Sequence, residues 1–249
     1  MNYHWNWSVF LQPSPDGQGN YFATLLWGLE WTLATALLAW AIALVVGSAV
    51  GVVRTTPAKW AVRLGNAYVD LFRNIPLLVQ MFLWYFVLPE LVPEAAGNWL
   101  KQLPNASFWT AVVCLGIYTS VRVAEQVRAG IQSLPRGQGM AGTALGLTLP
   151  QTYRHVLLPM AYRIILPPLT SEFLNIIKNS SVALTIGLME LTARARSMQE
   201  FSFQVFEAFT GATLLYLFVN IIVVFGMRRL EKSLQVPGYI GSGSVKAVH

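Results

Sequence analysis

The residues best suited to chemistry are a few polar side chains set in strongly apolar sequence. Glu172 and Lys178 lie in one such segment, and Asn179, Ser180 and Ser181 follow the lysine directly. Charges at the depth of a bilayer are costly and usually pair with each other or face a cavity. A lysine there needs either an acid partner such as Glu172 or an anionic ligand. The segment is therefore either part of a substrate path or a contact that holds the helices together.

A second charged group lies in an earlier apolar segment. Arg122, Glu125 and Arg128 are spaced i, i+3 and i+6, which places them near one face of a helix, where Glu125 can pair with either arginine. A structural ion pair explains this pattern as well as a polar path does. We keep both interpretations for Arg122 and Glu125.

Signatures of other chemistry are missing from the sequence. His4, His155 and His249 form no HExxH or paired-ligand spacing, so we expect no metal site. No lysine follows a glycine, which excludes the GxxxxGK[ST] phosphate loop, so we expect the chain to bind no cofactor and no ATP of its own. No Ser/His/Asp set converges within the apolar segments either, which argues against a membrane-embedded enzyme.

A polar stretch at 137–159 interrupts the apolar sequence. Thr148 to Gln151 has the form of a capping box, and Gly146 just before it can adopt a positive φ. These signals predict two short helices around a turn, one ending near Leu145 and the other running from Leu149 to about Leu158, with Pro159 at the exit. Such a shape suits docking on another protein. The alternative is an amphipathic hairpin that lies on the membrane surface.

The elements that must position these residues are membrane-spanning helices. The chain is 55% apolar and only 11% charged, whereas soluble domains carry about 25% charge. Thr32–Val53 contains no ionisable side chain and is long enough to cross an apolar layer of about 30 Å. We therefore predict an all-α integral membrane protein with about five spans: Tyr21–Val53, Tyr68–Leu88, Phe108–Ile131, Tyr162–Leu191 and Phe206–Met227. The fourth, which holds Pro167 and Pro168, is expected to be bent or broken.

The basic residues orient these spans. Most of them lie in the loops on one side of the membrane, which the positive-inside rule places in the cytoplasm. The N-terminus is then outside, and the 137–159 stretch and the C-terminus are cytoplasmic. Because the net charge of +6 is scattered singly, with no basic run, we expect no nucleic-acid partner. Gly47 and Gly51 form a GxxxG motif that would allow close helix packing.

The 137–159 stretch resembles the coupling loop of binding-protein-dependent ABC importer permeases. That pattern is Glu-Ala-Ala, three residues, Gly, nine residues, then Ile-x-Leu-Pro. Met140-Ala141-Gly142 takes the place of Glu-Ala-Ala, Gly146 is the glycine, and Val156 to Leu158 and Pro159 close the motif. Gly137 and Gln138 precede it. Met140 replaces the usual acid and Gly142 the second alanine, which puts in doubt any salt bridge that the acid makes.

The resemblance extends over about 21–234. The stretches RNIPLLVQMFLWYF, RVAEQVRAGIQSLPRGQ and SEFLNIIKNSSVALTIGLMELT are similar to the polar amino-acid branch of these permeases, most of all to glutamate/aspartate importers. This gives three expected regions: an interfacial periplasmic segment at 1–20, the transmembrane domain at 21–234, and a cytoplasmic tail at 235–249.

The resemblance implies a subunit of a larger complex with a type I importer fold. Its partners would be two cytoplasmic ATPase subunits that use ATP and Mg, a second homologous permease subunit, and a periplasmic amino-acid-binding protein, all at a bacterial inner membrane. It also implies an acidic amino acid as substrate, for which Lys178 would bind carboxylate and Glu172 or Glu125 the ammonium group. The alternative is a stand-alone secondary transporter or channel, which would have no use for a coupling loop.

Overall fold

The computed structural model describes residues 3–15, 17 and 19–234, so the predicted tail at 235–249 lies outside the described residues. The fold is helical throughout this part of the chain, with one isolated β-bridge between Pro13 and Asn20. This confirms the all-α class. In chain order the elements are η1 (Trp7–Leu11), α1 (Tyr21–Val53), α2 (Lys59–Arg73), α3 (Leu77–Phe82), η2 (Leu83–Val87), α4 (Leu88–Leu91), α5 (Glu94–Gln102), α6 (Ala106–Gln132), α7 (Arg136–Ala144), α8 (Leu149–Thr152), η3 (Tyr153–Leu157), α9 (Leu158–Asn179), η4 (Ser180–Ile186), α10 (Leu191–Ser202) and α11 (Val205–Leu234).

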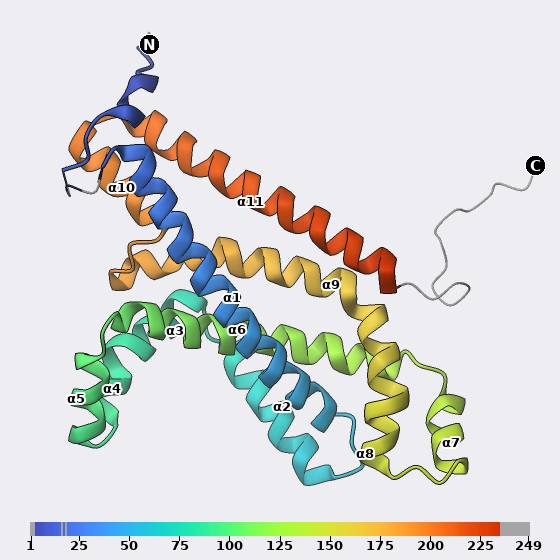
Figure 1. The fold of residues 1–249 in the computed structure, drawn as a ribbon. Coiled ribbons are helices and arrows are strands. Elements are labelled where there is room, and N and C mark those ends of the chain that lie inside the picture. Colours follow the sequence, from blue (N-terminus) through green and yellow to red (C-terminus); the bar gives the residue numbers. More distant parts are fainter. Residues whose placement is uncertain (1–2, 16, 18, 235–249) are drawn as a thin grey trace, which may run out of the picture.

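Helices α1 and α6 form the centre of the molecule and share its most extensive helix contact. Their backbones approach closely because glycines lie between them. A Cβ on Gly47 would sit 2.6 Å from the Ser120 carbonyl oxygen, and one on Gly51 would sit 2.7 Å from Val127 Cβ. The predicted role of this glycine pair in close packing is therefore confirmed. Helix α9 packs against α6, and α10 and α11 close the bundle beside α1 (Figure 1).

Within the described residues, three helices are long and apolar enough to cross a membrane: α1, α6 and α11. A fourth span exists if the bent pair formed by α2 and the helix at 77–91 counts as one. The sequence predicted five segments. The difference lies in the second and fourth of them, neither of which is a continuous helix.

The second predicted segment, Tyr68–Leu88, is broken at Asn74–Pro76, where the flanking helices turn by 99°. Pro76 has no backbone N–H and disfavours helical geometry at the residue before it. The amide nitrogen of Gln80 donates to the carbonyl oxygens of Phe72, at 2.8 Å, and Ile75, at 3.0 Å. This buried side chain satisfies carbonyls that the break would leave free. The prediction of one unbroken span here is wrong.

The fourth predicted segment, Tyr162–Leu191, is interrupted as expected, but not at its prolines. Pro167 and Pro168 lie inside α9, which continues to Asn179. The α-helix then tightens into the 3₁₀ helix η4 and ends at Gly187, whose φ of 85° lies in the left-handed region. Leu191 begins α10 after this turn. Glu172 and Lys178 thus lie on α9, and the C-terminal part of the predicted segment forms η4 and the turn after it.

Two π-helical turns, η2 and η3, each lead into a proline. In η2 the Leu88 N–H donates to the Leu83 carbonyl, and in η3 the Leu158 N–H donates to that of Tyr153. Proline one residue later lacks an N–H and clashes with the carbonyl four residues back, so a wider turn accommodates it. The helix that starts at Leu149 therefore passes Pro159 and continues as α9. The predicted exit at Pro159 is wrong.

Candidate functional site

The turn within the 137–159 stretch has the geometry that its sequence predicts. Gly146 has a φ of +77°, and helix α7 ends in a Schellman motif just before it. The Leu147 N–H donates to the Gly142 carbonyl and the Gly146 N–H to that of Thr143, both at 3.0 Å. A β-branched or bulky residue at position 146 would strain the backbone, although no atom lies within 4 Å of where its Cβ would be.

The predicted capping box is also present. The backbone N–H of Thr148 donates to Gln151 Oε1 at 2.8 Å, and the Thr148 hydroxyl donates to the same oxygen at 2.9 Å. Helix α8 therefore starts at Leu149 as expected, and together α7 and α8 form the predicted helix-turn-helix. We call residues 136–152 the docking loop.

Helices α7 and α8 pack tightly at Gly142. Gly142 is buried, and a Cβ added there would sit 2.9 Å from Thr152 Cγ2 and 3.0 Å from its hydroxyl oxygen. Thr152 is itself buried and donates to the Thr148 carbonyl. The glycine that departs from the coupling-loop pattern is thus matched to the threonine opposite it.

The outer surface of the docking loop is apolar and carries no acid. Met140, Leu145 and Leu149 have exposed fractions of 66%, 81% and 49%. Of the other residues assigned to the coupling loop over 137–159, Ala141, Gly137 and Pro159 are exposed, whereas Gln138 and Leu158 are partly covered. Between Glu125 and Glu172 the sequence contains basic residues but no acidic one. An exposed apolar surface with basic side chains is suited to contact with another protein.

Tyr153 connects the docking loop to the end of α1. Its hydroxyl donates to the Thr55 carbonyl oxygen at 2.9 Å and lies 3.0 Å from the Thr55 hydroxyl. Thr55 belongs to the elbow between α1 and α2. The docking loop is therefore linked to this elbow by direct contacts.

Arg54, the residue before Thr55, forms the shortest of the ion pairs around Glu125. One Arg54 guanidinium nitrogen lies 3.0 Å from Glu125 Oε1, and its Nε donates to Asn66 at 2.8 Å. Arg73 and Arg128 each approach the Glu125 carboxylate to 3.9 Å. The sequence indicated Arg128 as a partner of Glu125 but not Arg54, which is distant along the chain.

Arg122 has a different partner, Glu172 of α9, with 3.5 Å between a guanidinium nitrogen and the carboxylate. The Gln126 amide reaches the other oxygen of Glu172 at 3.4 Å, and the Arg122 guanidinium carbon lies 5.4 Å from the Tyr118 ring centroid. The Glu172 side chain is only 13% exposed, whereas that of Arg122 is 46% exposed. The structure thus brings together Arg122 and Glu172 across the α6–α9 contact.

Lys178 lies apart from both acids. It is exposed and makes no ion pair within the described residues. Asn179 is partly buried, while the hydroxyls of Ser180 and Ser181 donate to the carbonyls of Ile177 and Lys178. The candidate path residues therefore form two charged contacts, around Glu125 and Glu172, and one free cation. Within the described residues no group of three His, Cys, Asp or Glu is arranged to hold a metal ion.

The fold and the docking loop define a class of membrane transport subunit. Residues 43–236 match the family model of the binding-protein-dependent transport system inner membrane component. The chain belongs to this family and is a multi-pass membrane protein.

Individual relatives include amino-acid permeases. The chain is 48% identical over 97% of its length to the glutamate/aspartate import permease protein GltJ of Escherichia coli K12, of which it covers 99%. It is 37% identical over 86% of its length to the probable glutamine ABC transporter permease protein GlnM of Bacillus subtilis, of which it covers 94%. Among solved structures, one described as an amino acid ABC transporter with histidines matches with a TM-score of 0.72 and 29% identity, covering 86% of this chain and 95% of that one.

Proposed function

We propose that this chain is the permease subunit of an ABC importer that carries glutamate and aspartate across the bacterial inner membrane. The observation that carries the proposal is the exposed helix-turn-helix of the docking loop, formed by the motif that marks importer permeases. The identity to the glutamate/aspartate permease over nearly the full chain supports the substrate class. A stand-alone transporter would have no use for such a loop.

In this proposal the free energy comes from outside the chain. The sequence has no phosphate loop, so ATP and Mg are used by two cytoplasmic ATPase subunits that the docking loop contacts. A second permease subunit completes the path, and a periplasmic binding protein delivers the amino acid. Rigid-body motion passes from the ATPases through α7 and α8 to α9 and, through Tyr153, to the α1–α2 elbow.

The residues proposed for the path supply the charges that an acidic amino acid requires. Lys178 is an unpaired cation for one carboxylate, and Arg122, which is paired with Glu172, binds the other by exchanging this partner. Glu172, freed in this exchange, can accept the ammonium group. Glu125 is held by Arg54 and suits a structural role between α1 and α6.

A substitution at position 146 tests the docking role of the loop, because the positive φ, and not side-chain packing, restricts which residue fits there. Gly146→Val in the complete complex, reconstituted in proteoliposomes with its binding protein, should lower glutamate uptake at least about tenfold, since a β-branched residue is poorly tolerated at positive φ. Gly146→Asn, which tolerates that conformation, should retain most uptake. Gly226→Val adds the same side chain in α11, outside the loop, where a Cβ meets no atom within 4 Å, and is the matched control.

Two results would contradict the proposal. Uptake unaffected by Gly146→Val at normal complex yield would remove the docking role from the loop. Transport by this chain alone, without ATPase subunits, would support the secondary-transporter alternative. If the complex took up another amino acid but neither glutamate nor aspartate, the substrate assignment would be wrong and the importer class would stand.

A further inference from the structure

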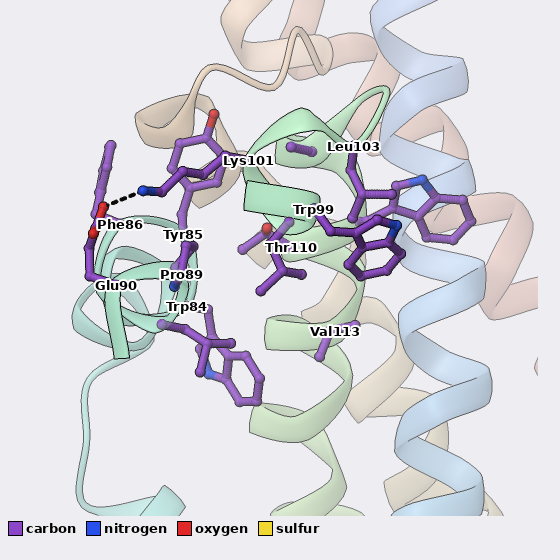
Figure 2. A pocket seen from close by; sticks show the side chains of 14 residues that line it. Trp84, Tyr85, Phe86, Pro89, Glu90, Trp99, Lys101, Leu103, Thr110 and Val113 are labelled. Atoms are coloured by element: carbon purple, nitrogen blue, oxygen red, sulfur yellow. Dashed lines mark ion pairs between the residues drawn. The ribbon is translucent and has the colours of Figure 1, made fainter. Parts of the chain in front are cut away.

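A large apolar pocket lies at the N-terminal end of α6, far from the docking loop. Its volume is about 670 Å³, within the range of about 300–1,000 Å³ typical of ligand sites. One wall comes from η2, α4 and α5 and the other from the first turns of α6, including Thr110 and Val113 (Figure 2). The remainder of the lining is mostly aromatic and aliphatic.

The wall formed by α4 and α5 is a rigid hairpin. Gly97 of α5 packs so closely on α4 that an added Cβ would lie 2.2 Å from the Pro89 carbonyl oxygen. An ion pair also ties the two helices, with 2.6 Å between Lys101 Nζ and Glu90 Oε1. The pocket therefore has a built shape and does not depend on the position of one mobile side chain.

The position of the pocket places it at the surface of the bilayer. Trp84, Trp99 and Trp109 line it, and tryptophan gathers at the level of lipid headgroups. Its α6 wall is the N-terminal end of a helix that is long and apolar enough to cross the membrane, where an interface is expected. The molecules available in quantity at this depth are phospholipids.

The charges of the pocket select the headgroup. Among the described residues, Glu90 and Lys101 are the charged ones that line it, and their side chains are 67% and 47% exposed. One anion and one cation side by side complement a headgroup that carries an ammonium and a phosphate. An acidic amino acid would face a single cation and a surrounding of aromatic rings, which offer nothing to its second carboxylate.

We infer that this pocket binds a zwitterionic phospholipid of the phosphatidylethanolamine type. An acyl chain lies against Trp84, Thr110 and Val113, the phosphate contacts Lys101, and the ammonium group contacts Glu90. The inference depends on the membrane location of α6 and not on the identity of the transported substrate.

Lipid retention by the purified complex tests this site. The complex is incubated with palmitoyl-oleoyl phosphatidylethanolamine in detergent and washed, and the retained lipid is measured by mass spectrometry. Val113→Trp fills the pocket from α6 and should remove the retained molecule. Val45→Trp adds the same side chain at a position of α1 that is 71% exposed, and it should leave retention unchanged.

The charge variants test the headgroup without filling the pocket. Lys101→Met should lower retention several-fold, because the cation that contacts the phosphate is lost, and Lys101→Arg should restore it. Glu90→Gln should shift the preference toward phosphatidylglycerol, which carries no ammonium group. If Val113→Trp does not yield complex, these variants decide.

Three outcomes would overturn the inference. Equal retention in the Val113→Trp and Val45→Trp complexes would show that the lipid binds elsewhere. If substitutions of Lys101 and Glu90 left the amount of retained lipid unchanged, the assignment of the headgroup to these residues would be wrong. A photoreactive residue at position 99 that cross-links in native membranes to another protein, and not to lipid, would assign the pocket to a subunit interface.

Discussion

At the scale of single residues, the departures from the family pattern have local physical causes. Gly142 stands where the coupling-loop pattern has alanine, and Thr152 fills the space that its methyl group would need. Met140 stands where the pattern has an acid, and its side chain is largely exposed. The first departure is an internal packing match, whereas the second changes what the loop offers to a partner.

The packing match predicts a compensating pair of substitutions. Gly142→Ala should destabilise the docking loop and lower uptake, because the new methyl group would sit 2.9 Å from Thr152 Cγ2 and overpacking typically costs about 1–3 kcal/mol. Gly142→Ala with Thr152→Ser should recover much of the loss, because serine lacks that methyl group. Uptake assays and ATPase co-purification measure both. If the double variant is no better than Gly142→Ala, the two residues are not coupled.

At the scale of elements, the docking loop joins two parts of the bundle that are distant in sequence. Its helix α8 continues through η3 into α9, and Tyr153 within η3 bonds to Thr55 after α1. Arg54, the neighbour of Thr55, holds Glu125 of α6. The docking loop is therefore continuous with α9 and bonded through Tyr153 to the end of α1, where Arg54 pairs with α6.

This connection predicts that Tyr153→Phe uncouples the complex without unfolding it. The ring stays buried, but both contacts to Thr55 are lost, and a buried hydrogen bond typically contributes about 0.5–1.5 kcal/mol. We expect glutamate transported per ATP hydrolysed to fall, while ATPase activity and complex yield remain near the wild-type values. A matched change, Tyr162→Phe, also removes a phenol hydroxyl, one that bonds Ser48 within the bundle, and should leave that ratio closer to wild type. A parallel fall of transport and ATPase activity would argue for a general structural role instead.

The sequence predicted the elements whose signals are local. The capping box at Thr148, the turn at Gly146 and the glycine pair of α1 were all recognisable because each depends on a few neighbouring residues. The breaks at Asn74–Pro76 and after Asn179 were not located, because a proline does not by itself fix a break. The helices continue past Pro89 and Pro159 through π-turns, whereas the chain turns at Pro76 and Gln80 satisfies the carbonyls that this break frees. The pairing of Arg54 with Glu125 and of Arg122 with Glu172 depends on which helices pack together, which no local pattern contains.

At the scale of the whole molecule, the segment at 3–11 packs against α11, which lies at the other end of the sequence. Val9 of η1 is fully buried against the residues around Tyr21 and Leu191, and Phe10 covers Gly211 of α11. In Figure 1 the N-terminal segment lies over the start of α11 and beside α10. The sequence identified this segment only as interfacial, from its tryptophans. In the structure, the segment at 3–11 also packs against α11 and so closes the bundle at this end.

A hydrogen bond between Tyr3 and Glu207 joins the N-terminal segment to α11, and high pH should break it. The Tyr3 hydroxyl donates to Glu207 Oε2 at 2.5 Å, and the backbone N–H of Asn6 donates to Glu207 Oε1 at 2.7 Å. The bond to Glu207 is the main reason that the pKa of Tyr3 is raised to about 12, with burial and the negative charge of Glu207 adding to it. Because the neutral phenol is the favoured form, its contribution is complete below the ordinary tyrosine pKa of about 10 and is lost as the pH rises through about 12. The fluorescence of Trp5, whose ring centroid lies 5.3 Å from that of Tyr3, should therefore change between these two pH values. Tyr3→Phe lacks the titrating group and should show no such transition at this end of the molecule; the same change in both proteins would place the titration elsewhere.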